Sequence, residues 1–103
     1  MTPRILAIIP ASNESGNIGR TVREILAQPL GVVPLVIDDG SRDDTSGEAL
    51  RAGAKVVVLP FNLGIGGAVQ TGYRYALEHD FDIAIQIDGL VIRCHWSDCK
   101  KYC

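Results

Sequence analysis

The chain has 103 residues, a hydrophobic content of 47% and a formal net charge of −2. This length allows one small domain, and a nearly neutral charge excludes the basic surface typical of nucleic-acid-binding proteins. No apolar run approaches the roughly 18 residues that a membrane helix needs, and the N-terminal run is too short for a signal peptide. We therefore expect a cytoplasmic protein, with the inner face of the membrane as a further location.

Strand and helix patterns alternate from the N-terminus. The β-branched run over residues 5–10 predicts a buried strand. Asn17 is placed to cap a helix that ends before Pro29. Val32 to Asp38 predicts a second strand, and Asp43 or Asp44 can cap the helix that follows, with Thr45 in its first turn.

Gly53 is placed to close this second helix, and residues 55–59 predict a third strand. The longest helix follows over residues 66–79, and we interpret His79 as a charge partner for its C-terminal end. Its predicted packing side consists of Ala68, Val69, Gly72, Tyr73, Ala76 and Leu77. Residues 83–87 predict a fourth strand.

Strands separated by helices predict right-handed crossovers and a parallel sheet with helices on both faces. The predicted fold class is α/β, a Rossmann-like three-layer sandwich with strand order 3-2-1-4. The fourth strand would then be an open edge, which invites self-association. Composition changes near Gly89, where three cysteines and the single Trp follow a cysteine-free segment. We therefore predict a domain over residues 1–89 and an atypical tail over residues 90–103.

Acidic residues stand where two of the strands stop. The carboxyl ends of parallel strands face one crevice, so we expect Asp39 and Asp88 to converge on a single site. Asp39 could accept a hydrogen bond from a base N–H, whereas Asp38 would be a structural partner to loop amides. Asp88 could bind Mg²⁺ or Mn²⁺, which bridges diphosphate oxygens. The second position of an Asp-any-Asp pair is Leu90, so only half of that pair is present.

Two other loops contain small residues. After the first strand, residues 10–14 would let a base or phosphate approach the backbone, and the following helix N-terminus favours anions. Taken alone, this loop is better explained as an ordinary strand–helix turn with an Asn cap. After the third strand, residues 62–68 match neither the dinucleotide fingerprint nor the Walker loop. The glycines there permit either close backbone approach by a ligand or close helix–sheet packing.

Together these loops resemble the family 2 glycosyltransferases, nucleotide-sugar-dependent enzymes that include dolichyl-phosphate mannose synthase. The resemblance covers residues 4–89 and rests on four motifs in order, at residues 8–14, 36–45, 62–68 and 86–89. It implies the nucleotide-binding half of a glycosyltransferase A-type fold. The nucleotide-binding residues it implies, with Asp39 contacting the base, are Pro10, Ala11, Glu14, Asp39, Gly64 and Gly66. Asp88 matches the first metal-binding carboxylate.

The implied function is to bind a UDP- or GDP-linked sugar with Mg²⁺ or Mn²⁺ for glycosyl transfer, with a polyprenyl phosphate as the acceptor class. Family members continue with a second metal carboxylate and an acceptor half, which residues 90–103 do not match. We therefore interpret the chain as truncated, assign no catalytic residue and expect little or no transfer by it alone. The alternative is a non-catalytic nucleotide-binding module or a self-associating half-domain.

The tail has two interpretations. His95, Cys99 and Cys103 are spaced by four, so a helix would place them on one face to bind Zn²⁺, with Cys94 as a fourth ligand. Structural zinc sites use Cys-x₂-Cys pairs instead, which favours an accidental tail from a frameshift, a rearrangement or a fragmentary gene.

A receiver domain is excluded, because it requires an acidic pair after the first strand and a fifth strand that is not evident.

Overall fold

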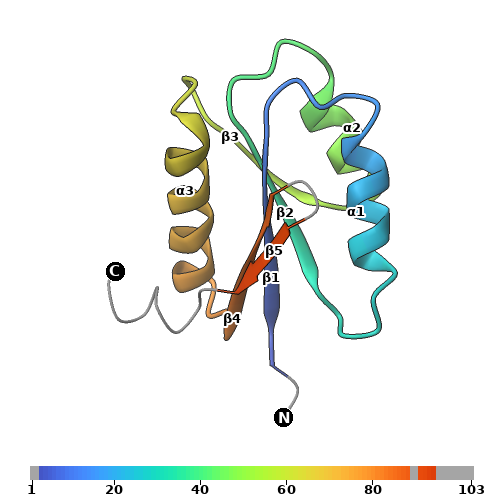
Figure 1. The fold of residues 1–103 in the computed structure, drawn as a ribbon, viewed down its shortest axis with the longest axis vertical. Helices are drawn as coiled ribbons and strands as arrows, with labels where there is room; N and C mark the ends of the chain where they lie inside the picture. The colour runs from blue at the N-terminus through green and yellow to red at the C-terminus, as the bar shows by residue number, and fades with distance from the viewer. Residues whose placement is uncertain (1–2, 89–90, 95–103) are drawn as a thin grey trace.

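The computed structural model describes residues 3–88 and 91–94, with only the backbone described at residues 88 and 91–94. These residues form strands and helices in alternation until the last pair of strands (Figure 1). The elements are β1 (Ile5–Ala11), α1 (Ile18–Leu26), β2 (Val33–Asp38), α2 (Thr45–Ala52), β3 (Lys55–Val58), α3 (Gly64–Glu78), β4 (Ile83–Asp88) and β5 (Val91–Cys94). Every predicted element is present, with boundaries shifted by one or two residues.

The strands form one sheet in the order β3-β2-β1-β4-β5. β1 lies parallel to both β2 and β4, and β2 lies parallel to β3. The α/β fold class and the predicted strand order 3-2-1-4 are therefore confirmed.

The expectation that a fifth strand is absent is wrong. β5 pairs antiparallel with β4, and Val91 lies opposite Asp88. β5 thus covers the β4 edge that was expected to be open, so the predicted route to self-association through that edge is wrong as well. β5 falls in the segment assigned to the tail, and the domain boundary near Gly89 stays a prediction.

The sheet is the middle of three layers. α3 covers one face, and α1 and α2 cover the other (Figure 1). Successive strand residues point to opposite faces, so each face has a core of its own. The core under α3 contains Leu6, Ile8, Leu35, Ile37, Leu59, Ala68, Ala76, Phe81 and Ala84. The core under α1 and α2 contains Ile9, Ala11, Ile18, Val22, Val36, Ala49 and Ala54.

α3 packs through small residues. Ala68, Gly72 and Ala76 are buried along one stripe of the helix, as predicted, but Leu77 is exposed. Small side chains on this stripe allow the helix axis to come close to the sheet. α3 also begins at Gly64, two residues earlier than predicted. None of the helices in the described residues is long and apolar enough to cross a bilayer.

The N-terminal ends of α1 and α2 lie where the sequence placed them, but the capping chemistry differs. Asn17 and Asp44 occupy the N-cap positions of α1 and α2, and neither side chain caps its helix. Asp43 accepts the Thr45 N–H at 3.0 Å instead. Gly53 ends α2 in the left-handed conformation, with φ of 107°. His79 occupies the C-cap of α3, and its role as a charge partner stays a prediction.

Candidate nucleotide-binding site

The carboxyl ends of β1, β2 and β4 lie along one edge of the sheet, where the loops after β1 and β2 also gather (Figure 1). Ala11 is opposite Asp38 across the β1–β2 pair, and Gln86 is opposite Ile8 across the β1–β4 pair. The backbones of Asp39 and Asp88 therefore lie at the same edge, on either side of β1. The side chain of Asp88 is outside the described part, so its role as a metal ligand stays a prediction.

Asp39 is buried where three segments meet, with 5% of its surface exposed. Its N–H donates to the Ala11 carbonyl at 2.8 Å, and its Oδ1 accepts the Leu63 N–H at 2.6 Å. Among the described residues, none donates a hydrogen bond to Oδ2. Asp39 thus joins β1 to the β3–α3 loop and retains one acceptor oxygen for another donor.

Asp38 uses both of its oxygens inside the protein. It is 4% exposed, its Oδ1 accepts the Ser41 N–H at 2.9 Å, and its Oδ2 accepts the hydroxyl of Ser46. The prediction that Asp38 is a structural partner to loop amides is confirmed. Neighbouring aspartates at one strand end therefore have different roles, since only Asp39 has an oxygen to spare.

The β1–α1 loop is held by side chains of the β2–α2 segment. Four consecutive backbone N–H groups of the loop donate to oxygens of that segment. The Asn13 N–H donates to Ser41 Oγ at 2.9 Å, and the Glu14 N–H donates to Thr45 Oγ1 at 2.9 Å. The Ser15 N–H donates to Asp43 Oδ2 at 3.1 Å, and the Gly16 N–H donates to Glu48 Oε1 at 2.8 Å. In return, the Arg42 N–H donates to Asn13 Oδ1 at 2.9 Å. The conformation of this loop is thus set by α2 and the residues before it.

Glu48 of α2 occupies the N-terminus of α1. Its Oε1 and Oε2 accept the N–H groups of Gly16 and Gly19, both at 2.8 Å. These two hydrogen bonds hold the pKa of the Glu48 carboxyl below its ordinary value, and the bond from Gly16 has the larger effect. An internal carboxylate therefore satisfies the helix end that was expected to favour an external anion, and that expectation is wrong.

Sequence reasoning missed Glu48. The spacing of Thr45 and Glu48 matches the capping-box pattern, which would have assigned both residues to the N-terminus of their own helix. In the structure Thr45 accepts from Glu14, and Glu48 accepts from α1. The pattern could have drawn attention to the pair, but it would have indicated the wrong partner.

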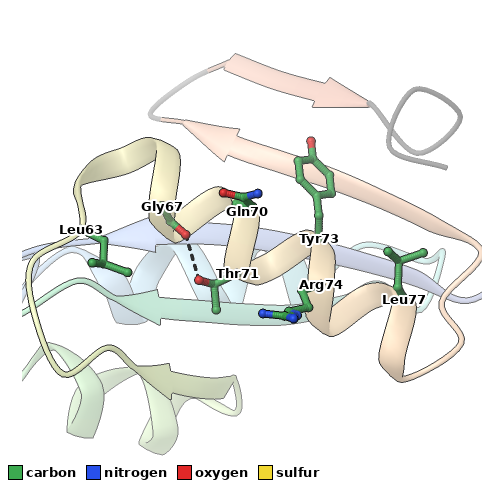
Figure 2. Close-up of a pocket in the computed structure, with 7 residues that line it drawn as sticks. All are labelled: Leu63, Gly67, Gln70, Thr71, Tyr73, Arg74 and Leu77. Atoms are coloured by element: carbon green, nitrogen blue, oxygen red, sulfur yellow. Dashed lines mark hydrogen bonds between the residues drawn. The ribbon is translucent and has the colours of Figure 1, made fainter. Parts of the chain in front are cut away.

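Among the hollows on the described surface are two of different size. The smaller, of about 110 Å³, opens beside the end of β1 and is lined by Ile9, Pro10, Glu14, Asn17, Ile18, Thr21 and Ile87. The larger, of about 710 Å³, runs along α3 and is lined by Leu63, Gly67, Gln70, Thr71, Tyr73, Arg74 and Leu77 (Figure 2). Only the smaller hollow includes predicted site residues, Pro10 and Glu14.

The remaining predicted residues are placed differently. The Ala11 side chain packs in the core under α1, with 4% exposure, and does not line the small hollow. Gly64 and Gly66 are exposed at the start of α3, and open space surrounds the position of a Cβ on either residue. Gly64 has φ of 79°, and its N–H donates to Asn62 Oδ1 at 3.0 Å. Their contact with a ligand stays a prediction.

Metal binding is not tested by the part of the chain that the structure describes. Within that part, no three His, Cys, Asp or Glu side chains gather into a group that could hold a metal ion. The proposed zinc ligands His95, Cys99 and Cys103 lie outside the described residues, as does the side chain of Cys94.

The sequence resembles curated proteins from archaea and bacteria. An uncharacterized protein of Methanocaldococcus jannaschii is 37% identical over 85 residues, which cover 82% of this chain and 35% of that protein. Undecaprenyl-phosphate mannosyltransferase of Micrococcus luteus is 34% identical over 92 residues, covering 84% of this chain and 37% of the mannosyltransferase. The chain thus spans little more than a third of the length of these relatives.

Solved structures show the same fold. Glucosyl-3-phosphoglycerate synthase from Mycobacterium tuberculosis, in complex with Mn²⁺, UDP and glucosyl-3-phosphoglycerate, superposes with a TM-score of 0.67 and 32% identity. The match covers 84% of this chain and 33% of the synthase. The family model described as "Glycosyl transferase family 2" matches residues 6–81. Since that match spans most of the sequence and agrees with the sheet topology, the chain belongs to glycosyl transferase family 2.

Proposed function

We propose that this chain is the donor-binding part of a glycosyltransferase, which binds a nucleoside diphosphate sugar at the carboxyl ends of β1, β2 and β4. The observation that carries the proposal is the spare oxygen of Asp39. A carboxylate oxygen in a 95%-buried residue has lost most of its hydration, so a hydrogen-bond donor there is favourable. The ring N–H of uracil or guanine would supply that donor.

The small hollow beside β1 supports this placement. Pro10 and Glu14 line it together with Ile87 of β4, so it lies beside β1 and next to the strand that ends at Asp88. Pro10 and Ile87 offer apolar surface to a nucleoside, and Glu14 offers acceptor oxygens to a ribose hydroxyl. Gly64 and Gly66 offer exposed backbone at the start of α3.

A divalent cation is part of the proposal. Asp88, at the end of β4, is the residue we assign to Mg²⁺ or Mn²⁺, which neutralises charge on a diphosphate leaving group. The mycobacterial synthase structures support the use of a divalent cation, because they were obtained with UDP and either Mn²⁺ or Mg²⁺. The name of the Micrococcus relative supports a polyprenyl phosphate as the acceptor class and a membrane-surface substrate.

Calorimetry with UDP and GDP, each with Mn²⁺, tests the proposal. We expect one nucleotide to bind, and D39A to weaken that binding at least tenfold, in the range of a lost hydrogen bond to a charged group. D44A is the matched control, because the Asp44 carboxylate is largely exposed and pairs with Arg51. The absence of binding by a chain that circular dichroism shows to be folded would contradict the proposal.

A transfer assay extends the same experiment. That these 103 residues alone transfer little or no sugar stays a prediction, and it is tested with UDP- or GDP-linked sugars and a polyprenyl phosphate. Binding without transfer would favour a donor-binding module, whereas transfer would show that the chain is active by itself. The alternative of a self-associating half-domain is tested by light scattering.

A further inference from the structure

We propose that Glu48 is a positioning residue for nucleotide binding, because its carboxylate sets the conformation of the loop that carries Glu14. This inference rests on the proposed function. Glu48 lines neither hollow, so it would act through the β1–α1 loop and without contact to the ligand.

Glu48 joins two parts of that loop and helix at once. Oε1 accepts the Gly16 N–H in the loop, and Oε2 accepts the Gly19 N–H in the first turn of α1, both at 2.8 Å. The Ser15 hydroxyl also donates to Oε1 at 3.4 Å. A carboxylate that accepts several N–H groups at a helix N-terminus is a strong, charge-assisted arrangement. Both ends of the turn into α1 are thus tied to one side chain of α2.

Glu14 is the residue through which this arrangement reaches the small hollow. Its N–H donates to Thr45 Oγ1 at 2.9 Å, and its carbonyl accepts the N–H groups of Asn17 and Ile18. The backbone of Glu14 is therefore held from α2 on one side and by the start of α1 on the other. Loss of the hydrogen bonds from Gly16 and Gly19 to Glu48 would loosen the start of α1, which holds the Glu14 carbonyl. The Glu14 side chain, which lines the small hollow, would then shift.

Glycine at position 19 leaves the space that the carboxylate fills. A Cβ on Gly19 would lie 3.2 Å from Glu48 Oε2 and 3.2 Å from Arg23 Nη1. Arg51 of α2 is the positive charge that acts on Glu48, whereas Arg23 of α1 lies beside the same Gly19 position and Asp43 accepts the neighbouring Ser15 N–H. The N–H groups of Gly16 and Gly19, together with Arg51, favour the ionised form of Glu48, which is the form that can accept from two amides.

The variant E48Q separates positioning from simple packing. Glutamine has nearly the same shape as glutamate, so contacts between α1 and α2 are preserved, but one amide N–H would then face a side-chain NH₂ group. E24Q is the matched control, because Glu24 is an exposed residue of α1 whose carboxylate makes no hydrogen bond or ion pair within the described residues. Both variants remove one negative charge.

Two measurements are made on each protein. Amide hydrogen exchange at Gly16 and Gly19 reports the loop, and calorimetry with UDP or GDP and Mn²⁺ reports binding. For E48Q we expect faster exchange at both amides and nucleotide affinity weaker by about tenfold, the order expected for lost charge-assisted bonds. E24Q should behave as the wild type. As pH falls and wild-type Glu48 is protonated, the difference in affinity between wild type and E48Q should narrow.

G19A provides a second variant that leaves Glu48 itself unchanged, and it should weaken affinity in the same direction. If the wild type binds neither nucleotide, both the proposed function and the proposed role of Glu48 in binding are wrong. If the wild type binds and folded E48Q binds equally well at neutral pH, only the positioning role is wrong.

Discussion

Gly72 of α3 packs directly against Ile8 of β1, so closely that a Cβ on Gly72 would lie 2.3 Å from Ile8 Cγ2. Only a residue without a side chain fits there. This close approach holds α3 against β1, one of the two inner strands of the parallel set. Because α3 begins immediately after Leu63, the same packing helps to bring the Leu63 N–H to the buried carboxylate of Asp39.

The variant G72A should be less stable than the wild type. The added methyl would overlap three carbon atoms of Ile8, and overpacking of a core costs about 1–3 kcal/mol. The higher helix propensity of alanine relative to glycine offsets only about 1 kcal/mol of this cost. The free energy of unfolding, measured in urea, should therefore fall. G66A is the control in the same helix, because nothing lies within 4 Å of its Cβ position, and it should not be destabilised. Equal stabilities of the two variants would contradict the close packing.

Asp38 should matter more for stability than Asp39. D38A leaves the Ser41 N–H and the Ser46 hydroxyl without their acceptor, whereas D39A removes the acceptor of one N–H, that of Leu63. Each unsatisfied buried donor costs about 1–3 kcal/mol. Urea unfolding should thus show the larger loss for D38A, although D39A has the larger effect on nucleotide binding. The reverse order of stabilities would be inconsistent with these contacts.

Acid should weaken the link between the β1–α1 loop and α2. The Thr45 hydroxyl lowers the pKa of Asp43, and the Gly16 N–H lowers the pKa of Glu48. Since both folded-state values lie below the ordinary ones, the stabilisation is fully present above the unfolded-state pKa values, about 3.9 and 4.3. It is lost as pH falls through the lowered folded-state values.

Urea unfolding over a pH series measures this effect. Between neutral pH and about 5 the contribution of these groups should be constant, and below about 4 the wild type should lose stability faster than E48Q. E24Q serves again as the control, and it should follow the wild type. Parallel curves for wild type and E48Q in acid would show that the Glu48 carboxylate has no special stabilising role.

The ion pair between Arg51 and Asp44 should contribute little. Its atoms are 2.6 Å apart, but the side chains are 68% and 62% exposed. Exposed ion pairs of this kind contribute little to stability because water screens the charges. R51A should therefore unfold at nearly the same urea concentration as the wild type, and added salt should change the difference only slightly. A loss as large as that of D38A would overturn this assessment.

Local sequence patterns determined the order and type of the elements. Short β-branched runs such as residues 5–10 and 83–87 predicted the buried strands, and helical periodicity between them predicted α1 to α3. The alternation also predicted a parallel sheet, and the predicted strand order 3-2-1-4 is confirmed. Asp38 and Asp39 at the end of β2 were also predictable, because a hydrophobic run that stops at carboxylates marks a strand end.

The tertiary structure decided which groups meet. Asn17 and Asp44 stand at helix ends as predicted, but the carboxylate that serves α1 comes from Glu48, 32 residues beyond Gly16. β5 likewise forms only because residues 91–94 meet the edge of β4. The reason is physical: periodicity records which face of a segment is buried, whereas a hydrogen bond between distant segments depends on how whole elements pack. Which loop oxygens remain free to bind a ligand therefore became visible only in the assembled sheet.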